Sequence, residues 1–171
     1  ITEIEAWGSS APVPETNVAL ASNGGVATAS STHDPGYAVD GVNDNRRSGA
    51  VWGAGGGWND ATPSTFPDWV QINFNGQKTI DHVVVYSLQD NYQSPVEPTD
   101  SMTFSLYGLT AFEVQGWNGS SWVTLASVSG NNLVKRTISF TAYTTDRIRI
   151  YITGTADSLW SRITEIEAWG Q

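Results

Sequence analysis

The densest group of metal-binding side chains lies in the segment AVDGVNDNRRS, residues 38–48. Ca²⁺ takes six to eight oxygen ligands from carboxylates, carbonyls and hydroxyls, and this segment crowds such oxygens around a glycine-containing turn. The same composition is typical of a solvated turn in which Asp40 caps backbone N–H groups. The segment alone therefore leaves both interpretations open. Its oxygen donors are Asp40, Asn43, Asp44, Asn45 and Ser48.

Aromatic rings and planar polar side chains also gather in the loops. Proteins bind sugars with these two groups, because rings stack on C–H faces and amides, guanidinium groups or carboxylates hydrogen-bond to hydroxyls. The segments are 31–37, 45–60, 89–93 and 157–161. The candidate ligand-binding residues are His33, Arg46, Arg47, Trp58, Asn59, Asp90, Asn91, Tyr92 and Trp160.

The sequence does not indicate catalytic machinery. Acidic residues can be paired on paper, such as Asp60 with Asp68, but acid–base catalysis needs both carboxylates in one concave site. No nucleophile-elbow motif is present, and the glycine-rich GAGGGW lacks the strand and helix that flank a phosphate-binding loop. His33 and His82 are far apart and there is no cysteine, so no zinc site is expected. We therefore expect a protein that is not an enzyme.

The composition narrows the possible partners. The net charge of −9 argues against nucleic acid and against electrostatic binding to an anionic membrane. No apolar run reaches the roughly 18 residues of a membrane span, so membrane insertion is not expected. The abundance of Gly, Ser, Thr and Asn, together with eight Trp, is common in extracellular all-β domains that contact sugars.

Short β-type runs separated by turn residues must position these loops. In WVQINF, residues 69–74, the apolar side chains alternate, and RIRIYIT, residues 147–153, repeats the pattern. Period-two alternation with one apolar face predicts antiparallel sheets packed on a core, and Asn118-Gly119 predicts a hairpin turn. We expect a β-sandwich or jelly roll. The predicted strands are 17–22, 26–31, 69–74, 80–88, 112–117, 121–126, 133–140, 147–153 and 162–169.

The octapeptide ITEIEAWG occurs twice, at residues 1–8 and at 163–170. An offset of 162 residues is the length of one ordinary domain, which predicts a tandem array; a cloning artefact is the alternative. Residues 1–8 would be the last strand of a preceding copy, and 9–16 would be a linker. The domain itself would span 17–171. We expect Ile1–Trp7 to stay out of this domain's own core.

The order of segments gives a stronger indication than any one of them. NVALASNGGVATASS, YAVDG, PDWVQINF, KTIDHVVVY, FEVQGWNGSSWVTL and the closing RITEIEAWG follow one another from residue 17 to residue 170. This order resembles the discoidin domain, also called the coagulation factor 5/8 type C domain, and in particular bacterial carbohydrate-binding modules of family 32. The resemblance implies an eight-stranded antiparallel jelly-roll β-sandwich with adjacent termini, a ligand bound by loops at one end, and a structural calcium.

The resemblance also implies a calcium ligand set. Asp40 would offer its side chain, Ala38 and Asn43 backbone carbonyls, and Ser48 a hydroxyl or carbonyl. Glu165 would supply the second carboxylate, with Glu167 as the alternative. The sequence departs from the family where a Thr and a Trp are usual, at Asn45 and Arg47, and this puts Ser48 in doubt. The Trp comes late, at Trp52, for which the family pattern implies a core position.

Taken together, these features predict a non-catalytic carbohydrate-binding module, a monomeric domain within a larger secreted or cell-surface protein. Its partner would be a glycan or polysaccharide. Two alternatives remain at this point: an adhesion domain for a protein or lipid partner, as in animal members of the family, and a structural spacer.

Overall fold

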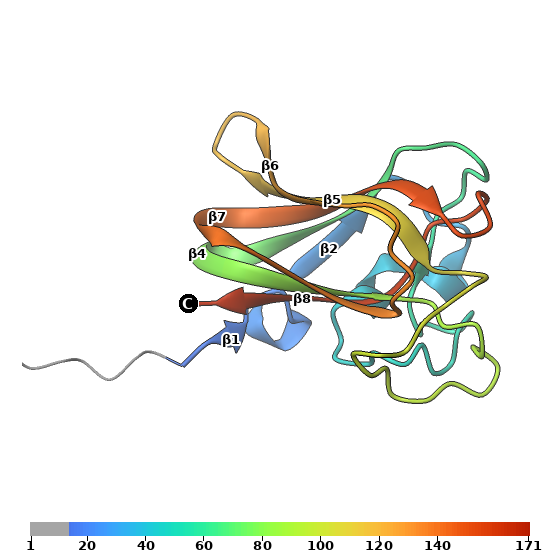
Figure 1. The fold of residues 1–171 in the computed structure, drawn as a ribbon. Helices are drawn as coiled ribbons and strands as arrows, with labels where there is room; N and C mark the ends of the chain where they lie inside the picture. Colours follow the sequence, from blue (N-terminus) through green and yellow to red (C-terminus); the bar gives the residue numbers. More distant parts are fainter. Residues whose placement is uncertain (1–13) are drawn as a thin grey trace, which may run out of the picture.

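Two layers of antiparallel β-strands pack face to face in the computed structural model, which describes residues 14–171 (Figure 1). This architecture confirms the predicted β-sandwich. The strands are β1 (Thr16–Asn17), β2 (Val26–Ala29), β3 (Trp58–Asn59), β4 (Asp68–Ser87), β5 (Leu109–Trp117), β6 (Trp122–Val128), β7 (Lys135–Thr155) and β8 (Arg162–Gly170). Three short 3₁₀ helices lie between them: η1 (Ala21–Asn23), η2 (Pro35–Tyr37) and η3 (Val39–Val42).

The long strands β4 and β7 take part in both layers. The first part of β4 pairs with β2 and with the second part of β7, and β7 then pairs with β5. The second part of β4 pairs with β8 and with the first part of β7. Between the two parts the register of β4 shifts twice, and Gly76 takes a φ of +79° that favours glycine. The sandwich is therefore one bent ladder rather than two separate sheets.

This continuity differs from the expected elements. The predicted strands 69–74 and 80–88 are the two parts of β4, and 133–140 and 147–153 are the two parts of β7. The predicted strand 17–22 ends after Asn17, whose side-chain oxygen accepts hydrogen bonds from the backbone N–H groups of Ala19 and Ala168. This side chain turns the chain away from the sheet and into η1.

The predicted alternation decides which side chains form the core. Val70, Ile72 and Phe74 in β4 are buried, as are Ile148, Ile150 and Ile152 in β7. The residues between them on β7, including Arg149 and Tyr151, lie partly exposed on the outer face. Within residues 14–171, the helical turns are too short to span a membrane.

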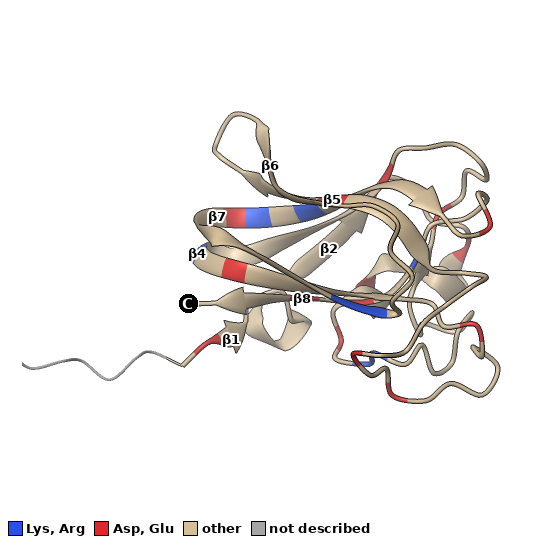
Figure 2. Ribbon diagram, in the orientation of Figure 1, with Lys and Arg blue, Asp and Glu red and all other residues tan. Residues whose placement is uncertain are grey.

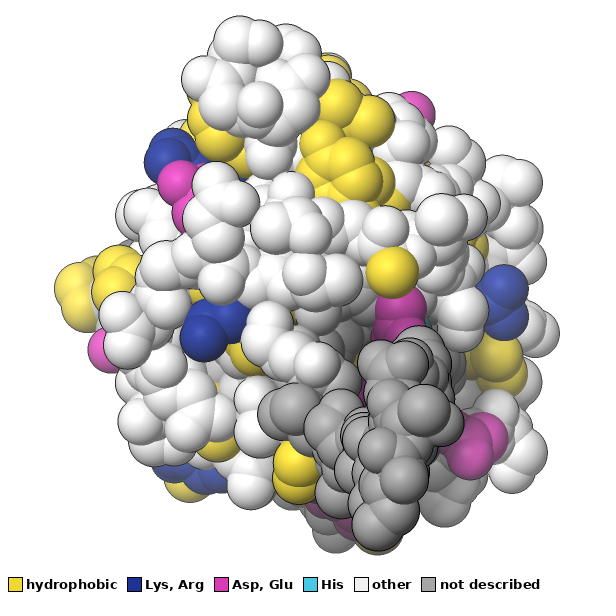
Figure 3. Space-filling view, turned by 90° about the vertical axis from the view of Figure 1, so that its left-hand side faces the viewer, with side chains coloured by type: hydrophobic (Ala, Val, Ile, Leu, Met, Phe, Trp, Pro, Cys, Tyr) yellow, Lys and Arg dark blue, Asp and Glu magenta, His cyan; other side chains and the backbone are white. Residues whose placement is uncertain are grey.

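The two ends of the described chain lie at the same end of the sandwich, which Figure 3 shows face on. Thr16, the last residue of the predicted linker, pairs with Gly170, so the sheet begins at that residue. The predictions for residues 1–8 and for most of the linker concern residues outside the described part of the chain.

Candidate functional site

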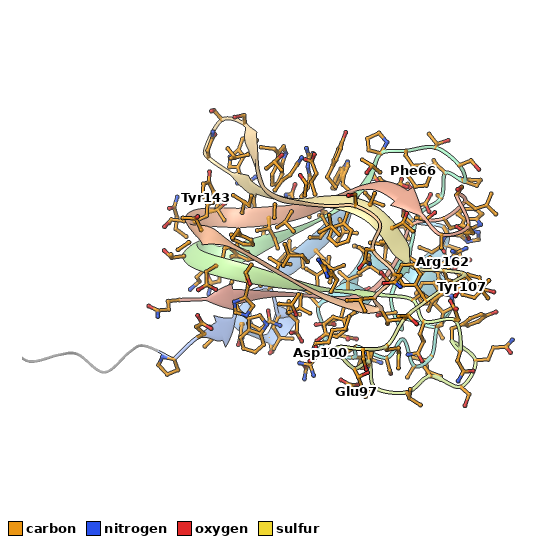
Figure 4. The ribbon with its side chains drawn as sticks, in the orientation of Figure 1. Phe66, Glu97, Asp100, Tyr107, Tyr143 and Arg162 are labelled. Carbon is orange, nitrogen blue, oxygen red and sulfur yellow. The ribbon has the colours of Figure 1, made fainter. Side chains whose placement is uncertain are left out.

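At the end opposite the termini, loops from five parts of the chain enclose a hollow of about 220 Å³. Residues on η2, β3 and the start of β8 contribute to it, together with the connections from β2 to η2, η3 to β3, β4 to β5 and β7 to β8. Tyr107 and Arg162 lie close together at this end in Figure 4. The lining residues are His33, Tyr37, Trp52, Asn59, Leu88, Tyr92, Tyr107, Trp160 and Arg162.

Aromatic rings form two walls of this hollow. On one wall, His33 packs edge to face against Trp160 at 5.1 Å and against Tyr37 at 5.5 Å between ring centroids. Tyr37 in turn meets Trp52 at 5.1 Å. On the other wall, Tyr92 and Tyr107 pack edge to face at 5.6 Å. Aromatic pairs favour this edge-to-face geometry, so the rings of each wall support one another.

Arg162 is the cation of the hollow, and its position is fixed from two sides. Its guanidinium lies 5.2 Å from the centroid of the Tyr107 ring and donates a 2.7 Å hydrogen bond to Asp157. Burial favours the neutral form of Asp157. However, the hydrogen bonds from Arg162 and from the backbone of Leu159 and Trp160 outweigh burial, and the pKa of Asp157 lies below its usual value. The ion pair uses one of the five N–H donors of Arg162.

Two further polar groups reach the hollow. His33 makes a 3.0 Å hydrogen bond through Nδ1 with Asp34, which also accepts the backbone N–H of Gly36 at 2.7 Å. The hydrogen bond from Gly36, followed by the one from His33, lowers the pKa of Asp34. Asn59 is buried and donates its amide hydrogen to the Asp60 carbonyl.

A buried network below the hollow holds its loops together. Asp60 accepts the backbone N–H of Ser161 at 2.7 Å, and Asp68 accepts the Ser161 hydroxyl at 2.8 Å. Both carboxylates are almost fully buried, and burial is the main reason why the pKa of Asp68 is raised. This pair anchors the segment that carries Trp160. It does not line the hollow, so its role here is structural.

The structure corrects the assignment of two tryptophans. Trp58 is fully buried in the core, where its indole N–H donates to the Ser31 carbonyl at 2.8 Å, so its ring is not available to a ligand. The short strand β3 pairs with β8 and turns Trp58 inward. Trp52, for which a core position was expected, lies half-buried against Tyr37 and lines the hollow.

Both predicted arginines lie elsewhere. Arg46 pairs with Asp44 at 2.8 Å on the surface. Arg47 lies on the outer face of the β4–β8 layer, where it forms a 2.5 Å ion pair with Glu167 and packs over the Tyr86 ring. Neither lines the hollow, because the loop from 43 to 48 folds over β8 instead.

Asp90 and Asn91 shape a wall without lining the hollow. Asp90 accepts the backbone N–H groups of Ser105 and Leu106 at 2.8 and 2.9 Å, and Asn91 donates to the Ser94 carbonyl. These bonds hold the long connection between β4 and β5 in the form that presents Tyr92 and Tyr107.

Four of the predicted ligand-binding residues line the hollow, and five further residues line it that were not among the candidates. The four are His33, Asn59, Tyr92 and Trp160, and the five are Tyr37, Trp52, Leu88, Tyr107 and Arg162. Arg162 had a signal, because it lies just after the predicted 157–161 loop and five residues from Asp157. Tyr107 had none, since the connection that carries it showed no periodic pattern.

The predicted calcium region contains one buried carboxylate that no cation compensates. Glu165 is fully buried and accepts the backbone N–H groups of Asp44 and Asn45 at 3.1–3.2 Å. Burial, together with the nearby charges of Asp44 and Glu167, raises the pKa of Glu165 to about 8. Glu167, by contrast, is neutralised by Arg47. Of the two alternatives, Glu165 is thus the carboxylate whose surroundings fit a bound cation.

The other predicted calcium ligands fit less well. Asp40 is exposed, and the Asn43 carbonyl already accepts the backbone N–H of Ala21. The Ser48 hydroxyl accepts from Ala50, and its carbonyl accepts from Gln89. The Ala38 carbonyl likewise accepts from Gly41. Within residues 14–171, no third carboxylate or histidine ligand gathers around Glu165. Because a carbonyl oxygen has two lone pairs, these bonds leave room for metal coordination.

The solved structures that resemble this chain share its fold over nearly its whole length. A chitosan-binding module in complex with chitotriose, from a Paenibacillus chitosanase/glucanase, matches with a TM-score of 0.65 and 22% identity, over 90% of this chain and all of that one. A fucose-binding module of Streptococcus pneumoniae gives 0.68 and 17%, covering 92% and 96%. A family 32 module of C. perfringens NanJ, in complex with galactose, gives 0.63 and 15%, covering 91% and 98%.

No curated protein sequence matches this chain. A family model does match, over residues 37–150, which is more than half of the sequence. That model describes the F5/F8 type C family, with the description "NedA-like, galactose-binding domain". The sandwich, the loop hollow at one of its ends and this match lead to one conclusion: the chain belongs to the F5/F8 type C (discoidin) family.

Proposed function

We propose that this domain is a glycan-binding module that takes one sugar ring into the hollow lined by Trp160, His33 and Arg162. The observation that carries this proposal is the combination of aromatic walls with a fixed guanidinium, an imidazole and an amide. Aromatic faces stack on the C–H side of a sugar, and the polar groups bond to its hydroxyls.

The size of the hollow sets the size of the ligand. Its volume of about 220 Å³ is below the range of about 300–1,000 Å³ that accommodates drug-sized ligands. This favours a single terminal sugar over the interior of a polysaccharide chain. The neighbouring modules whose structures hold galactose or chitotriose support a sugar as the ligand class. A single shallow site of this kind would bind with about micromolar to millimolar affinity.

A non-catalytic role is part of the proposal. Glycoside hydrolysis generally requires a pair of carboxylates at the reacting bond. Among the described residues that line the hollow there is no Asp or Glu. The two carboxylates bonded to lining residues, Asp157 and Asp34, are engaged by Arg162 and by His33. The domain would then act as a targeting module of a larger secreted or surface protein, and repeated copies would add avidity.

Calcium binding at Glu165 belongs to the same proposal. The ion would compensate the buried carboxylate and fix the loop of residues 43–48 against β8. Asp40, Asn43, Ser48 and Ala38 are the oxygen donors that would supply the remaining ligands. Its role would be structural, since Glu165 does not line the hollow.

The decisive experiment is a glycan array probed with the domain presented multivalently in calcium, followed by calorimetry on any hit. We expect binding confined to one terminal sugar, with at least a tenfold loss of affinity in Trp160→Ala. Trp122→Ala serves as the matched control, because Trp122 is a half-buried tryptophan that lies outside the hollow and packs against Trp117. Equal binding by both variants would contradict the site.

One observation favours a second candidate, an adhesion domain for a lipid surface. Val51, Leu106 and Leu159 are exposed, and each directly adjoins a residue that lines the hollow. This candidate predicts that the array shows no binding, that the domain sediments with neutral vesicles, and that Leu159→Ser abolishes the sedimentation. These results together would support a lipid surface rather than a sugar as the ligand. If the domain bound neither the array nor the vesicles, a role as a structural spacer would be the remaining alternative.

A further inference from the structure

A second group of ligand-type side chains lies at the opposite end of the molecule, where the chain enters the sandwich. Glu15 precedes β1, and Asp81 and His82 lie in β4. Their ligand atoms all lie within 4.8 Å of one another. Within residues 14–171, this is the one group of three or more His, Asp or Glu side chains brought so close together.

A bulge in β4 creates the pairing of Asp81 with His82. Successive side chains of a regular strand point to opposite faces, which would separate these two residues. However, two steps along β4, from Ile80 to His82, match a single step along β8, from Gly170 to Trp169, so Asp81 is an extra residue against β8. As a result, His82 Nδ1 lies 2.6 Å from the Asp81 carboxylate.

Glu15 reaches the same place through the end of β8. Gly170 pairs with Thr16 on one side and with Ile80 on the other, so residues 15 and 81 approach each other across the last residue of the strand. A hollow of about 210 Å³ opens there, and both Glu15 and Asp81 line it. The two carboxylates therefore border a space that can admit an ion.

The imidazole is oriented before any metal binds. His82 stacks parallel to the Trp169 indole, with an interplanar angle of 5° and a centroid distance of 6.2 Å. The Trp169 N–H donates to Glu167, which holds the indole in place. No Lys or Arg of the described chain forms an ion pair with Glu15 or Asp81. The site keeps its negative charge.

We propose that Glu15, Asp81 and His82 bind a zinc ion. An imidazole nitrogen with two carboxylates suits Zn²⁺, whereas Ca²⁺ and Mg²⁺ prefer oxygen ligands alone. Tetrahedral coordination places ligand atoms about 3.3 Å apart, and water completes the shell. The side chains are exposed or partly exposed, so core packing does not hold them back from the ion. On binding, the ion replaces the hydrogen bond between His82 Nδ1 and Asp81, and the proton of that bond moves to Nε2 or to solvent.

Zinc would tie the start of the domain to its body. β1 is only two residues long and pairs with β8 alone, so few contacts hold it. A metal that joins residue 15 to residues 81 and 82 would fasten this edge strand. The expectation that no zinc site exists rested on the distance between the two histidines; one histidine with two carboxylates is a different ligand set.

The test is a Zn²⁺ titration of the domain in saturating Ca²⁺, followed by NMR of the histidine rings. His33 is an internal control, because it also contacts a neighbouring aspartate, Asp34, but has no third ligand. We expect the His82 ring signals to shift and saturate while those of His33 do not. Equal responses of both histidines, or of neither, would overturn the proposal.

Variants extend the same test to the carboxylate from the other strand. Glu15→Gln should weaken Zn²⁺ binding at least tenfold and reduce the rise in melting temperature that Zn²⁺ gives, as should His82→Ala. Glu113→Gln is the matched control, a partly exposed glutamate on β5 outside this cluster. Unchanged Zn²⁺ affinity in Glu15→Gln would show that the aspartate–histidine pair acts alone and would overturn the three-ligand site.

Discussion

Asp157 and Arg162 show how one residue pair links the stability of the domain to its site. The pair is mostly buried, with 19% and 10% of the two side chains exposed, and it holds the guanidinium over Tyr107. A pair that were fully exposed would contribute little, whereas charge-assisted hydrogen bonds with restricted solvent contribute more. The pair is therefore a structural part of the hollow that we propose as the binding site.

The lowered pKa of Asp157 predicts a specific dependence of stability on pH. Because the pKa is lower in the folded state, the folded protein binds fewer protons at this group than the unfolded chain does. The stabilisation is therefore present above the unfolded pKa of about 3.9 and is lost as pH falls through the lower folded value. The free energy of unfolding of the wild type should exceed that of Asp157→Asn by about 1–3 kcal/mol at pH 6. This difference should shrink below pH 4.

Chemical denaturation at a series of pH values measures this difference in the free energy of unfolding. Asp146→Asn is the control, because Asp146 also has a lowered pKa, caused first by its hydrogen bond from Arg147, but lies on the surface. The free energy of unfolding of Asp146→Asn should differ less from that of the wild type at every pH, since solvent screens the Asp146–Arg147 pair. If the stability difference between the wild type and Asp157→Asn stayed constant down to pH 3, the ionised Asp157 would not be its source.

Residue types predicted which loops gather at one end of the sandwich better than which residues line the hollow there. Among the candidates, His33 and Trp160 line it, whereas Trp58 is buried in the core. The sequence could not indicate that Trp52 rather than Trp58 lines the hollow. Five glycines from Gly49 to Gly57 leave the backbone path of this loop unspecified. Several of these glycines take positive φ values, Gly53 and Gly55 among them.

At the scale of elements, alternation predicted the buried faces of β4 and β7 but not their continuity. Periodicity is a local property, so it identified Val70, Ile72 and Phe74 as one face. Whether two runs form one bent strand depends on pairing with residues far away in the sequence, such as Val70 with Ile150. The bulge at Asp81 depends on the same long-range pairing, which is why the cluster with Glu15 was not visible in the sequence.

The contact between the 43–48 loop and β8 leads to a prediction about calcium. Glu165 is buried and uncompensated, whereas Glu167, two residues further, is paired with Arg47. We expect Ca²⁺ to raise the melting temperature of the wild type by several degrees and to have no effect on Glu165→Gln, because the neutral amide has no charge to compensate. Scanning calorimetry with calcium and with chelator measures both.

Glu167→Gln is the matched control for this experiment. It removes the neighbouring carboxylate of the same strand and should keep the calcium response, although loss of the Arg47 pair lowers its stability. If the rise in melting temperature with calcium were lost in Glu167→Gln and kept in Glu165→Gln, Glu167 rather than Glu165 would be the calcium ligand. An equal response in wild type and Glu165→Gln would place the calcium elsewhere.

At the scale of the whole molecule, the charge distribution restricts the ligand. The chain carries a net charge of −9. Outside the strands, the charged residues of the described chain are mostly Asp and Glu, whereas most Lys and Arg residues lie on strands (Figure 2). The cation of the hollow is already neutralised by Asp157. An anionic ligand would meet the repulsion of the whole domain without a free positive charge at the site, so the molecule favours an uncharged sugar.

This argument predicts an affinity that salt does not change. For an uncharged sugar, the dissociation constant should vary less than twofold between 50 and 500 mM NaCl, on the order of experimental error, because only charge–charge attraction is screened at these concentrations. Calorimetry across this range, on whichever sugar the array identifies, measures the effect. Sialylated and sulfated glycans on the same array supply the comparison, and we expect them to bind weakly at every salt concentration. Affinity that fell steeply with salt would show that an acidic ligand uses Arg162, with Asp157 displaced from it.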